Sequence, residues 1–374
     1  MSSKDYIYCY QGSALRVAGS TAVIGERFVP DNVLVFKFDD ESFDPSSYST
    51  ITGAVWTQLS NSPNVWKWDA TDVKNTNWDS VFMNLFTWKP KGERGAVRIK
   101  AAGNMTIPTV LGTDSSPWPG MFRGNLALTD VCPLKFPNVI NSANLFNGCK
   151  YLNLAGLYVP NTASLKSAFK AGNNQVSFST RIGTITTSSA LKDVEQMFYG
   201  WASLIEAPYF ETSGVNNMTS MFKNCQSIRS IPLFDTSSCT NMSYMFSRCT
   251  SLTTVPLFNT SSCTDMGGMF DSCTSLTTVP LFDTSSCTDM GAMFYNCTAL
   301  TSVPLFDTSS CTNMNNMFIW CTKVESGALA LYQQASTQAN VPTHSGAFKY
   351  CGSNTVTGSA ELAQIPTSWG GTMA

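Results

Sequence analysis

The sequence predicts a mainly β repeat solenoid, a right-handed coil of short parallel strands with one helical turn in each 24-residue repeat. Three observations predict it. Prolines recur every 24 residues at Pro208, Pro232, Pro256, Pro280 and Pro304. A Met-Phe pair follows each of them at a fixed distance, and most of the cysteines keep the same period. Self-similarity at a fixed period indicates stacked supersecondary units instead of a single globular core.

The repeat that begins at Pro280, with the residues just before it, shows what one unit should form. Residues 276–281 alternate apolar side chains with Thr, which favours a short strand. Residues 283–286 (Asp-Thr-Ser-Ser) predict a turn, because Asp and Ser bond to nearby backbone. Residues 287–290 predict a second extended piece, and residues 291–294 predict one helical turn. Stacking would bury the apolar sides of successive units as ladders.

The array extends beyond its clearest part. Phe residues continue the period from Phe82 to Phe348, which indicates about eleven repeats. We expect an N-terminal arm or docking segment over 1–32 and an aromatic-rich cap over 33–69, with a separate ligand-binding domain as the alternative for the latter. The solenoid should occupy 70–325, with its clearest copies over 208–324. A C-terminal cap over 326–374 should hold a short helix at 327–336, with Leu329 and Tyr332 facing the stack.

Composition excludes several classes of function. Net charge is -2 and charged residues make up 13% of the chain, so no basic surface is predicted to hold nucleic acid. No apolar run approaches the length of a membrane span, so we expect no membrane insertion. The N-terminal residues do not resemble a secretory signal. If the protein acts outside a cell, we expect it to leave by another route.

The 13 cysteines fall mainly into two ladders. Cys225, Cys249, Cys273, Cys297 and Cys321 each follow the Phe by three residues, and Cys239, Cys263, Cys287 and Cys311 form the second ladder. Disulfides or a metal site are one interpretation. We favour small buried apolar residues, because the spacing follows the repeat and not the paired pattern of zinc sites. Free thiols also suit folding in a reducing cytosol.

The repeat Phe-Asp-Thr-Ser-Ser-Cys-Thr-Asn-Met-Ser-x-Met-Phe-x-x-Cys resembles the BspA-like leucine-rich repeat surface proteins, in the variant F-D-T-S-x-V-T-x-M-x-x-M-F-x-x-C. The second cysteine ladder replaces the usual Val. The resemblance is specific over 208–324, weaker over 70–207, and does not cover the first 60 residues or so. It implies a leucine-rich-repeat-like solenoid used for adhesion and recognition, without catalytic residues.

The repeats also resemble chains of tailed phages that infect gut Bacteroides-like hosts. This resemblance implies a virion component made in the host cytoplasm, such as a head or tail fibre, a receptor-binding protein or a host-attachment protein. Its implied partners are a host surface glycan or protein and, through the N-terminal arm, other virion proteins; a homo-oligomer stays open. An exported adhesin at the bacterial cell surface is the alternative.

Variation between the repeats indicates where binding would occur. The clear copies agree at apolar and turn positions but differ after the Met and after the Phe. Exposed Tyr, Trp and Arg are common interface anchors, so these positions predict a binding stripe on one face. Relaxed constraint on a solvent-facing surface is the competing interpretation. The stripe comprises Lys223, Tyr244, Arg248, Tyr295, Ile319 and Trp320.

The sequence predicts neither an enzyme nor a bound cofactor or metal. The single histidine, His344, lies in an expected loop without a marked catalytic partner. Asp265 and Asp289 fall at equivalent positions of successive repeats, where they could hold calcium but more commonly serve as turn residues. A glycan-cleaving fibre is the catalytic alternative. It would need two carboxyl groups about 5–10 Å apart in one groove, and Asp265 with Asp289 is the candidate pair.

Overall fold

The computed structural model describes residues 29–39, 44–47, 51–59, 64–78, 81–82, 97–112, 120–149, 151–171 and 182–373. The chain divides into two compact units, unit 1 over Met1–Ala190 and unit 2 over Leu191–Ala374. The expected N-terminal arm over 1–32 lies outside the described residues except for 29–32. Of the described residues, none belongs to a helix long and apolar enough to cross a membrane.

Unit 1 is built on an eight-stranded sheet with the order β10-β9-β6-β4-β1-β3-β2, in which β7 also pairs with β9. The antiparallel pairs are β1–β3, β1–β4 and β2–β3. The pairs from β4 through β6 and β9 to β10 are parallel. The strands are β1 Val33–Phe38, β2 Val55–Gln58, β3 Val65–Asp69, β4 Val97–Ala102, β6 Leu128–Val131, β7 Leu134–Lys135, β9 Asn153–Tyr158 and β10 Ile182–Thr186, and β5 Val110–Gly112 and β8 Asn141–Ser142 form a separate parallel pair.

Aromatic side chains form the core of unit 1. Strand β1 is apolar along almost its whole length and is buried between β3 and β4, as a central strand requires. Phe36 and Trp68 are fully buried, and their rings lie 5.4 Å and 4.7 Å from that of Phe82. From Phe82 the predicted Phe column continues to Phe122 and Phe146, with ring centroids 5.2 Å and 5.1 Å apart.

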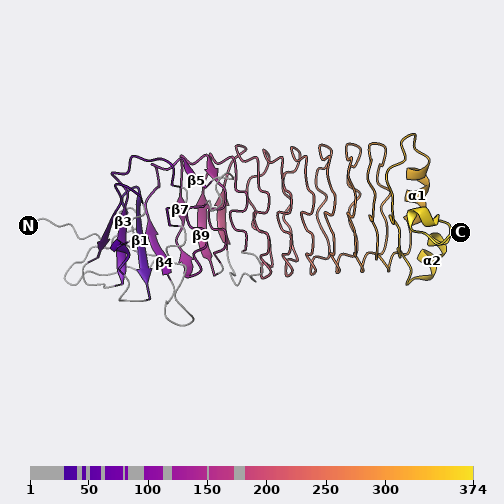
Figure 1. Cartoon of the computed structure of the whole chain (residues 1–374), viewed down its shortest axis with the longest axis horizontal. Helices are drawn as coiled ribbons and strands as arrows, with labels where there is room; N and C mark the ends of the chain where they lie inside the picture. Colours follow the sequence, from indigo (N-terminus) through magenta and orange to yellow (C-terminus); the bar gives the residue numbers. More distant parts are fainter. Residues whose placement is uncertain are drawn as a thin grey trace, which may run out of the picture. The chain divides into compact units, whose positions relative to one another are not determined.

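Unit 2 consists of 24-residue repeats that lie side by side in parallel register (Figure 1). Single parallel bridges join Asn217 to Asn241, Asn241 to Asp265, Asp265 to Asp289 and Asp289 to Asn313. The strand expected at 276–281 does not form. Thr277 donates its N–H to the carbonyl of Thr253 at 3.2 Å, but Pro280 has no N–H with which to continue a ladder. The expected short parallel strands are therefore reduced to isolated bridges in the described part of this unit.

The prediction of a helical turn at 291–294 is also wrong. Ala292 and Asn296 have φ of 53° and 57°, in the left-handed region. The N–H groups of Met290, Ala292 and Phe294 bond to carbonyl oxygens of the following repeat at 2.9, 2.8 and 2.9 Å. Every second N–H thus points toward the next repeat, which an α-helix would not allow because its N–H groups bond within the helix.

Buried side-chain columns run through these repeats, as the sequence predicts. The rings of Phe246, Phe270 and Phe294 stack with centroids 5.7 Å and 5.4 Å apart. All twelve cysteines among the described residues are buried free thiols. Cys273 donates to the carbonyl of Phe246 at 3.1 Å, and burial raises the pKa of Cys321 to about 12. The turn expected at 283–286 forms, because Asp283 accepts the N–H of Ser285 at 3.0 Å.

Unit 2 contains two helices near its C-terminal end. Helix α1 Ala328–Ser336 lies between the Phe318 and Phe348 repeats, and helix α2 Val356–Leu362 and a short 3-10 turn at Thr367–Trp369 follow the Phe348 repeat. Helix α1 confirms the predicted short helix but not its orientation. Its buried residues are Ala328, Leu331 and Ala335, whereas Leu329 and Tyr332 are half-buried. Spacings of three and four residues place the first three side chains on one face. Tyr332 instead lies at the edge of Trp369, 5.4 Å between ring centroids.

Candidate functional site

The predicted stripe occupies three neighbouring columns of unit 2, which we name by distance from the buried Phe of each repeat. Tyr244 belongs to the Phe−2 column. Lys223, Tyr295 and Ile319 belong to the Phe+1 column and are half-buried. Arg248 and Trp320 belong to the exposed Phe+2 column. The structure therefore spreads the six residues along the repeats instead of gathering them in one cleft.

Lys223 and Tyr244 form the first contact within the stripe. The Lys223 Nζ lies 4.3 Å from the centroid of the Tyr244 ring. Burial is the main cause that lowers the pKa of Lys223, and the charge of Arg248 lowers it further. Gly268 makes room for the ring, because a Cβ at that residue would lie 2.4 Å from Tyr244 Cε1. This arrangement presents a cation and an exposed aromatic ring together.

Trp320 forms the second contact, with a residue that the predicted stripe omits. Its ring stacks on that of Tyr350, with centroids 4.2 Å apart and an angle of 25°. Both rings are exposed, at 44% and 40%. Tyr350 follows Phe348 by two residues, as Trp320 follows Phe318, so the repeat pattern itself could have identified it. Within the described residues, Tyr295 makes no ring contact with either pair.

A second exposed surface of unit 2 was missed from the sequence. One residue in each repeat, between the Pro and the buried Phe, is 53–63% exposed. Because neighbouring residues of an extended segment point to opposite sides, burial of Phe258 or Phe282 turns the preceding Leu outward. Aligned exposed apolar side chains are a common sign of an interaction surface. We call this set the exposed Leu ladder: Tyr209, Leu233, Leu257, Leu281 and Leu305.

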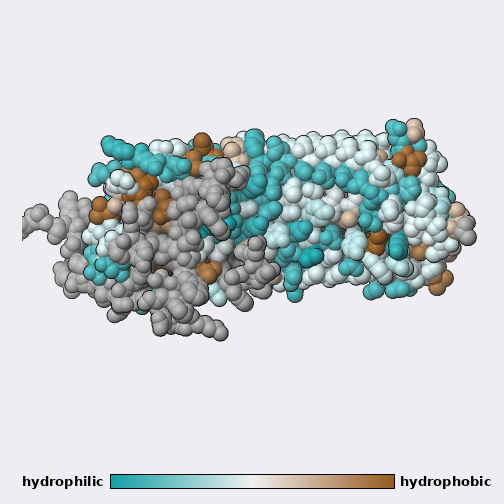
Figure 2. Space-filling model, viewed as in Figure 1, coloured by the Kyte–Doolittle hydropathy of each residue, from teal (hydrophilic) through white to brown (hydrophobic). Residues whose placement is uncertain are grey.

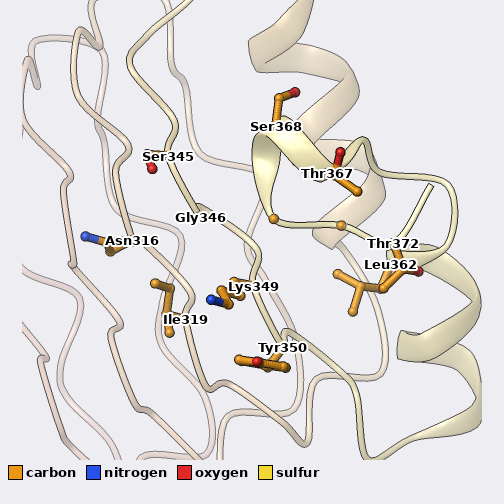
Figure 3. A pocket seen from close by; sticks show the side chains of 12 residues that line it. Asn316, Ile319, Ser345, Gly346, Lys349, Tyr350, Leu362, Thr367, Ser368 and Thr372 are labelled. Carbon is orange, nitrogen blue, oxygen red and sulfur yellow. The ribbon is translucent and has the colours of Figure 1, made fainter. Parts of the chain in front are cut away.

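A pocket of about 460 Å³ lies at the C-terminal end of the repeats (Figure 3). Asn316 and Ile319 line it from the Phe318 repeat, and Lys349 and Tyr350 line it from the Phe348 repeat. The segment 367–372 closes it with hydroxyl groups and glycines. Its volume falls within the range of about 300–1,000 Å³ that small ligands occupy. Ile319 is the one residue of the predicted stripe that lines this pocket.

The acidic pair has a structural role in the repeats. Asp265 and Asp289 each accept the N–H two residues further on, at 2.9 and 2.8 Å. Asn241 and Asn313 donate to them at 3.3 and 3.0 Å. Burial is the main cause that raises the pKa of Asp265, and the charge of Asp289 adds to it. Of the described residues, no three His, Cys, Asp or Glu gather as metal ligands would.

His344 packs against the end of the repeats. Its ring stacks on that of Trp369 with centroids 3.9 Å apart, and its Nδ1 lies 2.8 Å from the carbonyl oxygen of Pro342.

The face of unit 2 drawn in Figure 2 is mostly hydrophilic to neutral, with scattered hydrophobic residues. Binding on such a face would depend on individual aromatic and charged side chains.

Comparison with known families identifies the class of repeat. A model described as "Mycoplasma protein of unknown function, DUF285" matches residues 119–232 and again residues 216–332. Together the two matches cover more than half of the chain, so the protein belongs to the DUF285 family. No curated protein matches the chain.

Proposed function

We propose that this protein is a non-enzymatic recognition protein, and that its repeats form a right-handed leucine-rich-repeat-like solenoid of the BspA-like type. The observation that carries the proposal is the regular array of unit 2. Buried Phe, Met and Cys columns hold the repeats, while the positions beside them vary and include Tyr244, Arg248 and Trp320 on the surface. A rigid array with variable exposed side chains suits binding to an extended partner.

We further propose that the protein is a phage virion component that attaches to a host surface glycan or protein. Buried free thiols support synthesis in a reducing cytoplasm, where disulfides seldom form. The resemblance of the repeat to those of tailed phages supports the same assignment. An exported bacterial adhesin is the competing proposal, and it would use the same surface.

Mass spectrometry of purified virions tests the location. We expect peptides of this chain at a stoichiometry of at least one copy per particle. Absence from the particle, together with presence in the cell-envelope fraction of an uninfected bacterium, would support the adhesin instead. Attachment of the purified chain to host cells tests recognition separately. A chain that binds no cells and blocks no adsorption would contradict a recognition role.

A further inference from the structure

The segment around the buried Phe of each repeat in unit 2 has a direction, because every second N–H group in it points toward the next repeat. In the Phe318 repeat, Asn316 and Trp320 donate to the carbonyl oxygens of Ser345 and Lys349, at 3.0 and 3.1 Å. The same pattern holds one repeat earlier, where Ala292 and Asn296 donate to Asn315 and Ile319. The last repeat of such an array therefore presents N–H groups without a following repeat to accept them.

The Phe348 repeat is that last repeat, and its continuation satisfies one of three donors. Phe348 donates its N–H to the carbonyl oxygen of Trp369 at 2.8 Å. The N–H groups of Gly346 and Tyr350 have no acceptor among the described residues, and both residues line the pocket. The bonded N–H of Phe348 lies between these two groups, so each of them needs an acceptor of its own.

The charged group that lines the pocket is positive and therefore favours a negatively charged ligand. Among the described residues that line it, Lys349 is the only Lys or Arg, and none is Asp or Glu. Glu361, on the neighbouring helix α2, is already engaged, because it accepts the N–H groups of Gly327 and Leu329 at 3.3 and 3.1 Å. A carboxylate in the pocket would therefore meet the Lys349 ammonium group, and none of the described lining residues would repel it with a negative charge.

The rest of the lining is polar. Thr367, Ser368 and Thr372 line the pocket (Figure 3), and their hydroxyl groups can both donate and accept hydrogen bonds. Tyr350 lies at the floor of the pocket in this view and is 40% exposed. Its ring stacks on that of Trp320, and the Lys349 Nζ lies over it, 5.4 Å from the centroid. An aromatic face packs against the apolar C–H face of a pyranose, whereas a simple inorganic anion would gain nothing from it.

We infer that this pocket binds an acidic sugar residue of a surface glycan. The carboxylate lies against the ammonium group of Lys349 and accepts one of the two unpaired N–H groups, that of Gly346 or that of Tyr350. The sugar ring packs on the exposed part of Tyr350 beside Lys349, and its hydroxyls bond to the 367–372 segment. This inference rests on the proposed recognition function and names the chemical class of the glycan.

Saturation-transfer NMR on the purified full chain tests it. The probes are glucuronic acid, galacturonic acid and N-acetylneuraminic acid, with glucose and galactose as neutral sugars and acetate as a simple carboxylate. We expect at least one acidic sugar to bind about tenfold or more tightly than the neutral sugars and acetate. Lys349→Gln and Tyr350→Ala should each weaken that binding by a similar factor. Lys323→Gln and Tyr158→Ala, at exposed residues that do not line the pocket, should leave it unchanged, and thermal melting checks that all four variants fold.

Three results would overturn the inference: no binding of any acidic sugar, equal binding of acetate, or unchanged binding in folded Lys349→Gln. Host-cell attachment by the same preparations separates this failure from failure of the proposed function. Attachment that persists without acidic-sugar binding would reject the pocket and retain recognition through another surface.

Discussion

The two units stack buried Phe rings at similar distances, but their backbones differ. Unit 1 contains the named strands, and its central strand β1 pairs with both β3 and β4 over most of its length. Unit 2 has single bridges and alternating N–H bonds between repeats. The difference teaches that a regular side-chain column can align repeats where prolines and left-handed residues prevent strands. Side chains should therefore contribute as much to stability in unit 2 as in the sheet of unit 1.

Truncation of a column residue should have the largest effect. Phe270 is fully buried between Phe246 and Phe294, so Phe270→Ala should lower the free energy of unfolding by about 3–5 kcal/mol. Phe36→Ala, in the sheet of unit 1, should cost a similar amount. Urea denaturation of both variants measures the comparison. Leu281→Ala, at an exposed position, serves as the control and should change stability by less than about 0.5 kcal/mol.

A much smaller loss for Phe270→Ala than for Phe36→Ala would show that backbone hydrogen bonds, and not the columns, hold unit 2 together. If both variants lose the same free energy of unfolding, we expect similar losses at the Phe residues of the other repeats, which are buried in the same way.

Replacement of the aromatic residues of the stripe should affect binding more than this stability, because none of them is fully buried. The triple variant Tyr244→Ala, Tyr295→Ala and Trp320→Ala should weaken host-cell attachment by at least about tenfold. A matched triple variant of the exposed Leu ladder, Leu233→Ala, Leu257→Ala and Leu281→Ala, separates the two surfaces. Loss of attachment in the second variant alone would assign recognition to the Leu ladder and reject the stripe.

Neutralisation of the acidic pair should have a smaller effect on stability. Burial first, and the Asp289 charge next, raise the pKa of Asp265 above 3.8. Native protein then holds this proton more tightly than unfolded protein, so the contribution of Asp265 to the free energy of unfolding rises as pH falls through the raised pKa. Asp265→Asn places there the residue found at Asn241 and Asn313. It should raise the free energy of unfolding at pH 7 by about 0.2–1 kcal/mol.

Denaturation between pH 4 and pH 7 checks this sign. Asp283→Asn should not produce the gain, because hydrogen bonds from Ser285 lower the pKa of Asp283. Its contribution is present above 3.8 and is lost as pH falls through the lowered pKa. If Asp265→Asn instead lowers the free energy of unfolding at pH 7, the carboxylates of Asp265 and Asp289 do not destabilise the native protein by repelling each other.

The period and the buried columns could be predicted from the sequence, because the same residue type recurs at the same place in each repeat. Phe270 and Cys273 recur at fixed places, and burial explains both. The backbone between them was harder to predict, since Tyr244, Arg248 and Trp320 adopt left-handed φ that such residues seldom show. The exposed Leu ladder was missed because an apolar residue beside a buried Phe was taken as core.

The pocket could not be predicted from the repeat alone. It joins Ile319 and Lys349 to the segment 367–372, which belongs to no repeat. The unpaired N–H groups of Gly346 and Tyr350 follow from the direction of hydrogen bonding, and no side-chain pattern carries that information.

Deletion of one complete repeat tests most directly whether columns hold unit 2 as a stack. Without residues 256–279, Pro280 would follow Val255 in the register of the preceding repeat, and Phe294 would stack on Phe246. We predict a folded protein with a cooperative thermal transition by circular dichroism, slightly less stable than the parent because one interface is gone. Deletion of residues 256–267, half a repeat, should break every column and unfold the unit. If both deletions unfold it equally, repeat stacking does not hold it together.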